Sequence, residues 1–501
     1  MTHFLTAAAL SVAILFSAPA PVLAQPVAGE RLPFDTVSLL ESGAVGDDMT
    51  DDTEALRSAF KKGARGLCLD GGNKVFRVTG TLRADGNLCL VNTRLKQMIE
   101  PVDTLPYIKS TGREPPIMSA AEPARFYPED PVLSDNEHRE LELRNNLRTI
   151  FVTGRRSGVV YLRNVQVSRG DFETLGTASN AAGIWVTDSP SVRMFNVEVF
   201  GSGRGHGVFV TGSQNIELSQ LNIHDLRWSS DRGDRAFTLA QMRNLYEWNN
   251  VPLYIYDQKA RRFGVLRSQE QTNGLVILNS ENISLTNSQI ARVLYNARGV
   301  YIPWQADGIT MGHDRNVEIS HLNVEEVWEG IDFTGMEGVE SFHLSDLTIK
   351  DIFGFGLKLV HATNSGSVDR VNISYSGLNG IVVSDSANNI EINHATIRET
   401  GVLYLPNGTL LSPYIEAGVF RQNIAGIGIT ANKADPANNP KRIHIDNSTA
   451  RNLENPNLMR FGLSSDVTES DQVVIENFEA SGYKWKAIGN QRLARELERA
   501  H

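Results

Sequence analysis

The stretch Glu329-Gly330-Ile331-Asp332-Phe333 contains the pattern that decides the fold: one residue, a glycine, and then an apolar-x-apolar triplet. The pattern recurs at Ala182-Gly183-Ile184-Trp185-Val186, His206-Gly207-Val208-Phe209-Val210, Asp307-Gly308-Ile309-Thr310-Met311, Phe355-Gly356-Leu357-Lys358-Leu359 and Asn379-Gly380-Ile381-Val382-Val383. The later copies are spaced roughly 22 to 26 residues apart, which is the period of one solenoid coil. Alternating apolar residues predict strands, and only turn residues connect them. The sequence therefore predicts an all-β, single-stranded right-handed parallel β-helix.

Equivalent residues of successive coils stack about 4.8 Å apart in such a fold, so a column in the sequence becomes a column in space. Both aliphatic residues of each triplet must fill the tube, and the middle residue must therefore point out to solvent. The outward column reads Trp185, Phe209, Thr310, Asp332, Lys358 and Val382, and the column before the glycine reads Ala182, His206, Asp307, Glu329, Phe355 and Asn379. Three carboxylates and one lysine are thus predicted to meet in three consecutive coils.

Composition excludes some classes of partner. The 501 residues carry a formal net charge of −10, whereas a general nucleic-acid binder has a basic surface. No stretch supplies the roughly 20 apolar residues of a membrane-spanning helix. We therefore expect no nucleic-acid binding, because of the acidic net charge, and no membrane insertion. A solenoid grows by adding coils, and one long domain is therefore expected; the oligomeric state is left open.

The N-terminus predicts export. A short apolar stretch from Phe4 to Phe16 precedes Val22-Leu23-Ala24-Gln25, which fits a secretory signal cleaved after Ala24, although its first residues carry no Lys or Arg. We expect residues 1–24 to be a signal peptide and the mature protein to be secreted or periplasmic, in a bacterial-type setting.

Two cysteines, Cys68 and Cys89, each stand in the centre of a Leu-Cys-Leu triplet, about one coil apart. Adjacent strands would bring them to a Cα separation near 5 Å, which suits a disulfide in an oxidising compartment. The alternative is a pair of buried free thiols. A metal site is not expected, because no histidine lies near them.

Residues 25–97 are predicted to hold a cap helix and the first coils. Asp51 as N-cap and Glu54 three residues later form an expected capping box, and the helix should run to about Lys62 with Ala55, Leu56, Ala59 and Phe60 on its apolar face. Such a helix can cover the open end of a solenoid. The chain just before this helix resembles the N-terminal region of pectate-lyase-superfamily β-helix proteins. The resemblance lies in Gly43-Ala44-Val45-Gly46-Asp47 and in the Thr50-Asp51-Asp52-Thr53 that follows. That resemblance implies a pectin-lyase-like fold shared by hydrolases, lyases, epimerases and phage depolymerases.

The remaining organisation follows from where the coil pattern lapses. We expect a Pro-rich irregular excursion over residues 98–145, and a β-helix over 146–480 with inserted loops at 227–272, 296–305 and 401–424. A C-terminal segment with a short amphipathic helix is expected over 481–501. Loops on a rigid scaffold often carry binding groups, and aromatic rings and arginines suit sugar rings and uronate carboxylates. Arg298, Tyr301 and Trp304 are therefore candidate substrate contacts, together with His206 and His313.

Asp307, Glu329, Asp332 and Lys358 are the candidate catalytic residues. Two carboxylates about 5 Å apart raise one another's pKa, which separates a general acid from a general base for glycoside hydrolysis. Lys358 beside Asp332 would keep that carboxylate ionised. The alternative is a surface ladder of alternating charges that only stabilises neighbouring strands.

The family resemblance both supports and limits this hypothesis. In polygalacturonase-type hydrolases an Asn-x-Asp-Gly coil carries a catalytic Asp, and Gln305-Ala306-Asp307-Gly308 matches only its last two residues. The family's Asp-Asp pair falls on Glu329-Gly330, and its Gly-His-Gly falls on Gly354-Phe355-Gly356, so the site is a degenerate one.

Three functions follow from these patterns. The leading hypothesis is an exported carbohydrate-active enzyme that hydrolyses a polysaccharide, with no cofactor firmly implied. A polysaccharide lyase or C5-epimerase acting on a uronate-containing glycan is the first alternative, because His313-Asp314-Arg315 resembles the His-Asp motif of mannuronan epimerases; a lyase could use Ca²⁺. A glycan-binding β-helix without catalysis is the second.

Overall fold

The computed structural model describes residues 31–98, 134–136, 147–171, 181–202, 205–226, 252–257, 262–267, 273–293, 306–334, 337–404, 410–411, 424–431, 435–456, 458–467 and 472–490. The signal peptide, most of the 98–145 excursion, Arg298, Tyr301, Trp304 and the C-terminal helix expected near Leu493 and Leu497 lie outside these residues. Among the described residues, no helix has the length and apolar character needed to cross a membrane.

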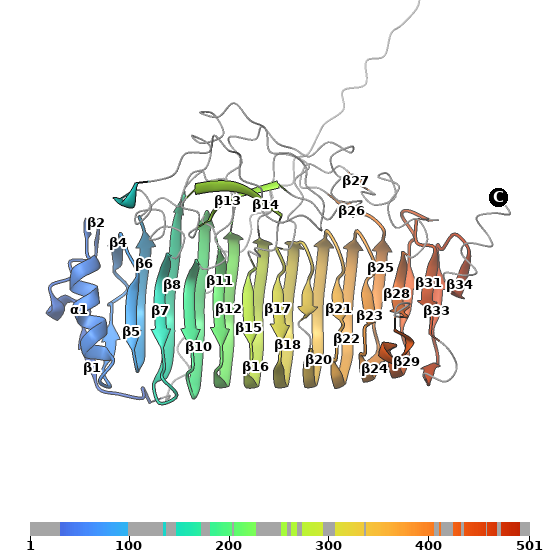
Figure 1. Ribbon diagram of the computed structural model, residues 1–501, viewed down its shortest axis with the longest axis horizontal. Helices are drawn as coiled ribbons and strands as arrows, with labels where there is room; N and C mark the ends of the chain where they lie inside the picture. The colour runs from blue at the N-terminus through green and yellow to red at the C-terminus, as the bar shows by residue number, and fades with distance from the viewer. Residues whose placement is uncertain are drawn as a thin grey trace, which may run out of the picture. The chain divides into compact units, whose positions relative to one another are not determined.

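A right-handed parallel β-helix is what the chain forms, as predicted (Figure 1). Each coil contributes a short strand to a parallel sheet whose strand order follows the chain, one step per coil. In the described residues this sheet consists of β5 (Leu82–Asp85), β7 (Arg148–Thr153), β9 (Ala182–Thr187), β11 (His206–Thr211), β15 (Leu275–Leu278), β17 (Ile309–Gly312), β19 (Ile331–Phe333), β21 (Leu357–Leu359), β23 (Ile381–Ser384), β28 (Ala425–Thr430), β31 (Phe461–Ser465) and β34 (Lys486–Gly489). We call it the triplet sheet, because the apolar-x-apolar triplets lie in it.

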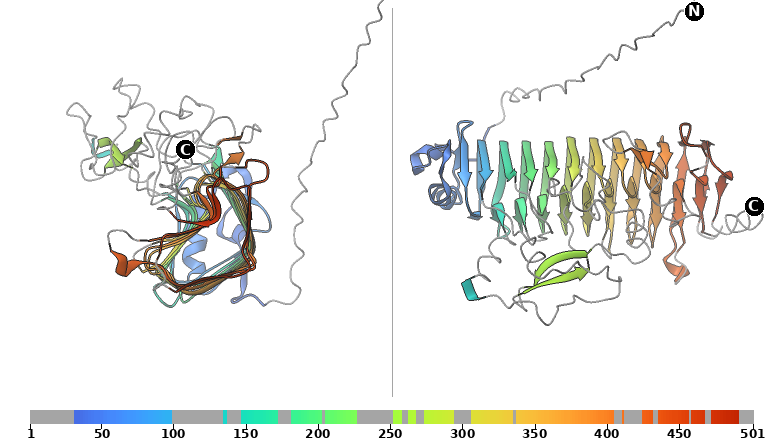
Figure 2. Two further views of the ribbon diagram at one scale, coloured as in Figure 1. Left: turned by 90° about the vertical axis from the view of Figure 1, so that its right-hand side faces the viewer. Right: turned by 90° about the horizontal axis from the view of Figure 1, so that it is seen from above.

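The rest of each coil lies in a second sheet, which we call the bent sheet. Its described strands are β1 (Thr36–Ser38), β2 (Asp47–Asp51), β3 (Cys68–Asp70), β4 (Val75–Val78), β6 (Leu88–Gln97), β8 (Val159–Asp171), β10 (Ser191–Ser202), β12 (Gln214–Leu226), β16 (Glu281–Val293), β18 (Asp314–Val327), β20 (Val339–Ile352), β22 (Asn364–Ser376), β24 (Asn388–Asn393), β25 (Thr396–Thr400), β29 (Lys441–Asp446), β30 (Thr449–Arg451), β32 (Val473–Ile475) and β33 (Glu479–Ser481). Viewed along the stack, the coils superpose (Figure 2).

Left-handed residues bend the long strands around the tube. In β12 they are Asn215, Gln220 and Asp225, with φ of 47°, 54° and 52°, one at every fifth position. Asn tolerates this conformation better than most residues, which explains the recurring Asn. The Asn side chains also stack: Asn196 Nδ2 donates to Asn164 Oδ1 at 2.9 Å, and Asn164 Nδ2 donates to Asn92 Oδ1 at 3.0 Å. These amide hydrogen bonds form a ladder that joins neighbouring coils.

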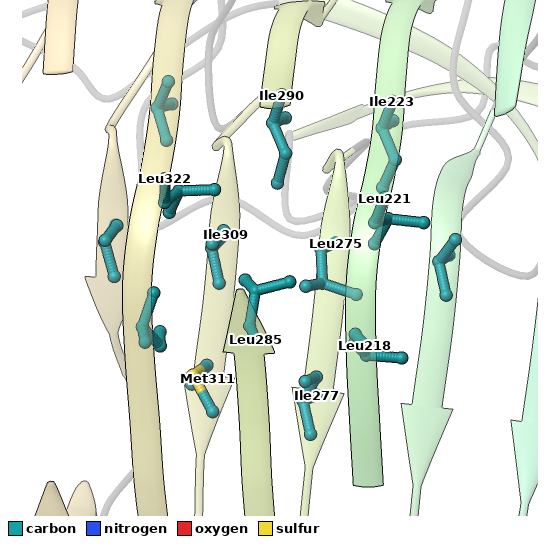
Figure 3. Packing of buried hydrophobic residues seen from close by; sticks show 14 of the residues in the cluster. Leu218, Leu221, Ile223, Leu275, Ile277, Leu285, Ile290, Ile309, Met311 and Leu322 are labelled. Atoms are coloured by element: carbon teal, nitrogen blue, oxygen red, sulfur yellow. The ribbon is translucent and has the colours of Figure 1, made fainter. Parts of the chain in front are cut away.

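Aliphatic side chains fill the tube in stacked rows. Leu275 pairs in register with Ile309, which pairs with Ile331, and all three are fully buried. Figure 3 shows Leu275, Ile277, Ile309 and Met311 of the triplet sheet facing Leu285 and Ile290 of the bent sheet across the interior. Because inward and outward positions alternate, this packing fixes which residues of the triplet sheet point out of the tube.

The helix α1 (Thr53–Gly63) packs on β3, β5 and β6 at the N-terminal end of the stack, as expected of a cap (Figure 1). Leu56, Ala59 and Phe60 are buried. The predicted capping box is wrong: Asp52 is the N-cap, and Glu54 pairs with Arg57 at 2.5 Å. Asp51 instead accepts the backbone N–H of Thr53 at 3.0 Å, while the Asp52 side chain accepts the N–H groups of Val45 and Gly46 rather than capping the helix.

Cys68 of β3 and Cys89 of β6 are in register and form a disulfide with a Cα separation of 4.4 Å, as predicted. The described residues also include two short 3₁₀ helices, η1 (Leu39–Ser42) and η2 (Pro436–Asn438). Two antiparallel hairpins are also present, β13 (Pro252–Asp257) with β14 (Arg262–Arg267), and β26 (Leu403–Tyr404) with β27 (Leu410–Leu411).

The longest insertions share one position in the coil. They fall between the end of a bent-sheet strand and the start of the next triplet-sheet strand, as between β6 and β7, β12 and β15, β16 and β17, and β25 and β28. That connection enters the triplet sheet at the residue before the glycine. Every long insertion therefore leaves and rejoins the coils at the edge where the column of His206, Asp307 and Glu329 lies.

Candidate active site

Strand register brings the predicted catalytic residues together. Asp332 of β19 pairs with Lys358 of β21, and Thr310 of β17 pairs with Asp332. In the column before the glycine, the N–H of Gly308 donates to the carbonyl of Glu329 at 2.8 Å, which places Asp307 and Glu329 on neighbouring coils. The predicted columns are thus confirmed as spatial columns on the outer side of the triplet sheet.

Asp307, Glu329, Asp332 and Lys358 form what we call the acidic cluster. Lys358 Nζ lies 3.0 Å from Glu329 Oε2 and 3.3 Å from Asp332 Oδ1. One oxygen from each of the three carboxylates lies within 4.8 Å of the others. Three acids and one ammonium group therefore share a volume that a single sugar ring would span.

The cluster is far more buried than predicted. The sequence placed these side chains in solvent, whereas Asp307, Glu329 and Asp332 are only 1%, 5% and 3% exposed. They do point away from the tube, so the register was right and the solvent exposure was wrong. Alternation along a strand fixes the side of the sheet on which a residue lies, but it does not fix whether that side is exposed to solvent.

Burial raises the pKa of all three carboxyl groups, and the charges of neighbouring carboxylates add to the shift at Asp307 and Glu329. Asp307 is affected most: desolvation, then the charges of Glu329 and Asp332, raise its pKa well above the usual range. Desolvation raises the pKa of Glu329 to about 7, although Lys358 opposes the shift. Desolvation also raises the pKa of Asp332, again against the pull of Lys358. Asp307 is therefore the member that holds its proton most strongly, and Lys358 favours the ionised form of Asp332.

Lys358 is an ammonium group across the physiological range. Desolvation lowers its pKa, but the charges of Glu329, Asp332 and Asp307 more than compensate and raise the pKa above its usual value. Carboxylate oxygens are also the ligands that Ca²⁺ and Mg²⁺ prefer. Asp307, Glu329 and Asp332 could offer such ligands, although the sequence predicted none, and Lys358 already places one positive charge among them.

Two polar residues that the sequence analysis did not select support Asp307. Thr310 Oγ1 donates to Asp307 Oδ2 at 3.0 Å, and Asn273 Nδ2 donates to Thr310 Oγ1 at 2.7 Å. Asn273 begins the coil Asn273-Gly274-Leu275-Val276-Ile277, which has the same five-residue pattern as the others. The long insertion before it breaks the period, but the pattern itself was visible in the sequence.

His206 and His313 lie at opposite ends of the strands of the triplet sheet. His206 lies in the column before the glycine, and its Nδ1 accepts the N–H of Asn273 at 3.1 Å, so it touches the residues that support Asp307. His313 follows the opposite end of β17, has a φ of 58°, and lies 3.8 Å from Glu337. The strand β17 therefore separates His313 from Asp307, and the structure does not bring His313 into the acidic cluster.

An aromatic stack continues the outward column toward the N-terminus. The rings of Trp185 and Phe209 stack with centroids 4.0 Å apart, and the guanidinium of Arg148 lies 3.9 Å from the Trp185 centroid. Both faces of Trp185 are thus occupied, and only 9% of the residue is exposed. This stack stabilises neighbouring coils and offers no free Trp185 face to a sugar.

Comparisons with known proteins establish the fold. The Dettilon tailspike protein aligns with 91% of this chain and 68% of its own, at 12% identity and a TM-score of 0.50. The A-module of an Azotobacter vinelandii mannuronan C-5 epimerase aligns over 91% and 97% at 12% identity and a TM-score of 0.40. A polygalacturonase from Erwinia carotovora aligns over 92% and 97% at 13% identity and a TM-score of 0.41. No protein-family model matches the chain, and no curated protein matches it. The chain therefore has the right-handed parallel β-helix fold.

Proposed function

We propose that the protein is an exported enzyme that cleaves a polysaccharide by glycoside hydrolysis at the acidic cluster. The observation that carries the proposal is the meeting of three buried carboxyl groups with unequal pKa values around one lysine. Carboxyl groups pushed apart in pKa are the arrangement that supplies an acid and a base at the same pH. A purely structural charge ladder would not need three acids against one base in a buried place.

Asp307 is the proposed general acid. Its proton passes to the glycosidic oxygen as the bond from that oxygen to the anomeric carbon breaks. Asp332, held ionised by Lys358 at 3.3 Å, is the proposed base: it takes a proton from the water whose oxygen bonds to the anomeric carbon. Glu329 completes the shared network, since Lys358 also contacts it at 3.0 Å.

Hydrolysis is favoured over β-elimination because the cluster has no ready base for carbon acids. A lyase needs a neutral lysine, arginine or histidine to abstract the proton next to a uronate carboxylate. The raised pKa of Lys358 keeps it protonated, and His313 lies at the far end of β17. The long insertions rejoin the coils beside Asp307, which supports Arg298, Tyr301 and Trp304 as proposed substrate contacts.

Export is part of the proposal. It rests on the predicted signal peptide over residues 1–24 and is supported by the Cys68–Cys89 disulfide, because disulfides persist in oxidising compartments. A polysaccharide substrate outside the cytoplasm agrees with such a location.

The test is to incubate the protein with a panel of neutral and acidic polysaccharides while following two signals. Reducing ends without ultraviolet absorbance from unsaturated uronates support hydrolysis. Both signals together mean a lyase, and a changed sugar composition without new ends means an epimerase. Binding of a glycan with no product of any kind would mean a non-catalytic glycan-binding protein, and would overturn the proposal.

A further inference from the structure

Asp307 is held by a closed set of hydrogen bonds that involves two residues outside the acidic cluster. The backbone N–H of Asp307 donates to Asn273 Oδ1 at 3.1 Å, Asn273 Nδ2 donates to Thr310 Oγ1 at 2.7 Å, and Thr310 Oγ1 donates to Asp307 Oδ2 at 3.0 Å. Asn273 and Thr310 are 0% and 2% exposed. Water therefore has little opportunity to compete for these bonds.

The orientation of the Asn273 amide is fixed by chemistry. Its two ends differ only in that the oxygen accepts and the nitrogen donates. A backbone N–H can only donate, so the end that faces Asp307 N must be the oxygen. The end that faces Thr310 must then be the NH₂ group, and it can only donate.

The direction of the Thr310 hydroxyl follows from that of the amide. Its oxygen already accepts a hydrogen from Asn273, so its single hydrogen is available for Asp307 Oδ2. With the hydroxyl hydrogen directed at Oδ2, that oxygen is an acceptor, and a proton on the same carboxyl group has its place on Oδ1. The other oxygen, Oδ1, is buried and has no hydrogen-bond partner among the described residues.

We propose that Asn273 and Thr310 are positioning residues that fix the acidic proton of Asp307 on Oδ1. A carboxyl group free to rotate would distribute the proton between both oxygens, whereas here Oδ2 is occupied by an incoming hydrogen bond. The inference rests on the proposed function only for the later step, in which Oδ1 releases the proton to the leaving oxygen. The placement of the proton itself depends on the hydrogen bonds alone.

The test is a carboxyl titration of the whole protein without substrate. Protein labelled with ¹³C at Asp carboxyl carbons is titrated by NMR, and the Asp307 signal is the one that Asp307→Asn removes. Thr310→Val keeps the shape of the side chain and removes the donor to the charged carboxylate. Its loss should raise the Asp307 midpoint by about one to two pH units. Thr310→Ser keeps the hydroxyl and should restore the wild-type midpoint, and Asn273→Ala should shift it in the same direction as Thr310→Val.

Thr286→Val is the matched control, because the Thr286 hydroxyl bonds to Ser219 on the bent sheet at 3.2 Å and should leave the Asp307 midpoint unchanged. Equal midpoints in wild type and Thr310→Val, or a Thr310→Ser protein that behaves like Thr310→Val, would overturn the inference. The two proposals fail separately. A shifted midpoint in a protein whose Asp307→Asn variant is fully active supports the proton placement and overturns the catalytic role. An unshifted midpoint with an inactive Asp307→Asn variant does the reverse.

Discussion

Replacing Lys358 by Met should destabilise the protein strongly at alkaline pH and weakly at acidic pH. The ammonium group lies 3.0 Å from Glu329 and 3.3 Å from Asp332, and both carboxylates are almost fully buried. Removing one partner from a buried ion pair typically costs about 3–5 kcal/mol, because the remaining charge is left without compensation. We expect a loss of about that size at pH 8.

The dependence on pH follows from the raised pKa values. A carboxyl group whose pKa is higher in the folded than in the unfolded protein contributes stability below its unfolded pKa, and this contribution disappears as the pH rises through the folded pKa. For Glu329 that loss is centred at about pH 7, and the pKa of Asp307 is also raised. At pH 5 Glu329 is mostly neutral and needs Lys358 little, so the penalty for Lys358→Met should be smaller than at pH 8.

Urea unfolding midpoints of wild type and Lys358→Met at pH 5 and pH 8 measure this difference. Lys96→Met is a suitable control, because Lys96 pairs with Asp48 at 3.2 Å in a half-exposed position, far more open to solvent than the acidic cluster, and should change the midpoint little at either pH. A penalty for Lys358→Met that is equal at the two pH values, or no greater than that of Lys96→Met, would refute the reasoning.

Three further predictions concern the scaffold. Desolvation opposes the charging of His224, but the hydrogen bonds from its ring to Asp225 and Glu198 raise its pKa to about 9. The stability that the charged His224 adds to the folded protein is therefore complete below pH 6.5 and is lost as the pH rises through 9. Thermal unfolding of His224→Gln should therefore show a deficit at pH 6 that vanishes above pH 9. Thiol titration of the denatured, unreduced protein should find no free thiol, and two free thiols would contradict the Cys68–Cys89 bond. Gly308→Ala would place a Cβ 2.5 Å from Val324 and 2.6 Å from the Gly330 carbonyl, so its urea midpoint should fall by the equivalent of about 1–3 kcal/mol, and an unchanged midpoint would contradict this packing.

The sequence predicted the coils because their glycines and alternating aliphatic residues repeat. That repetition was enough to place Asp307 beside Glu329 and Asp332 beside Lys358. It was not enough to predict their burial, because alternation along a strand fixes the side of the sheet on which a residue lies and not its exposure to solvent. The Asn273 coil was concealed by the long insertion that precedes it.

Local polar detail was the least predictable. Asp51 and Asp52 are equally good N-cap residues, and the choice between them depends on the bonds that Asp52 makes to Val45 and Gly46, at 2.6 and 3.1 Å. Thr310 stood in the predicted outward column, but its role depends on Asn273, 37 residues earlier in the chain. Such pairs become visible only when the stacking of the coils is known in three dimensions.

The catalytic role of the acidic cluster is tested most directly by the turnover of Asp307→Asn and Asp332→Asn, the variants of the proposed acid and base, on a polysaccharide that the wild type cleaves. Both amides keep the shape of the side chain and remove a buried ionisable group, so the variants should fold. They should each lose about 10²–10⁴ in rate of reducing-end release, because proton transfer is abolished. Near-normal turnover by both variants would contradict the account.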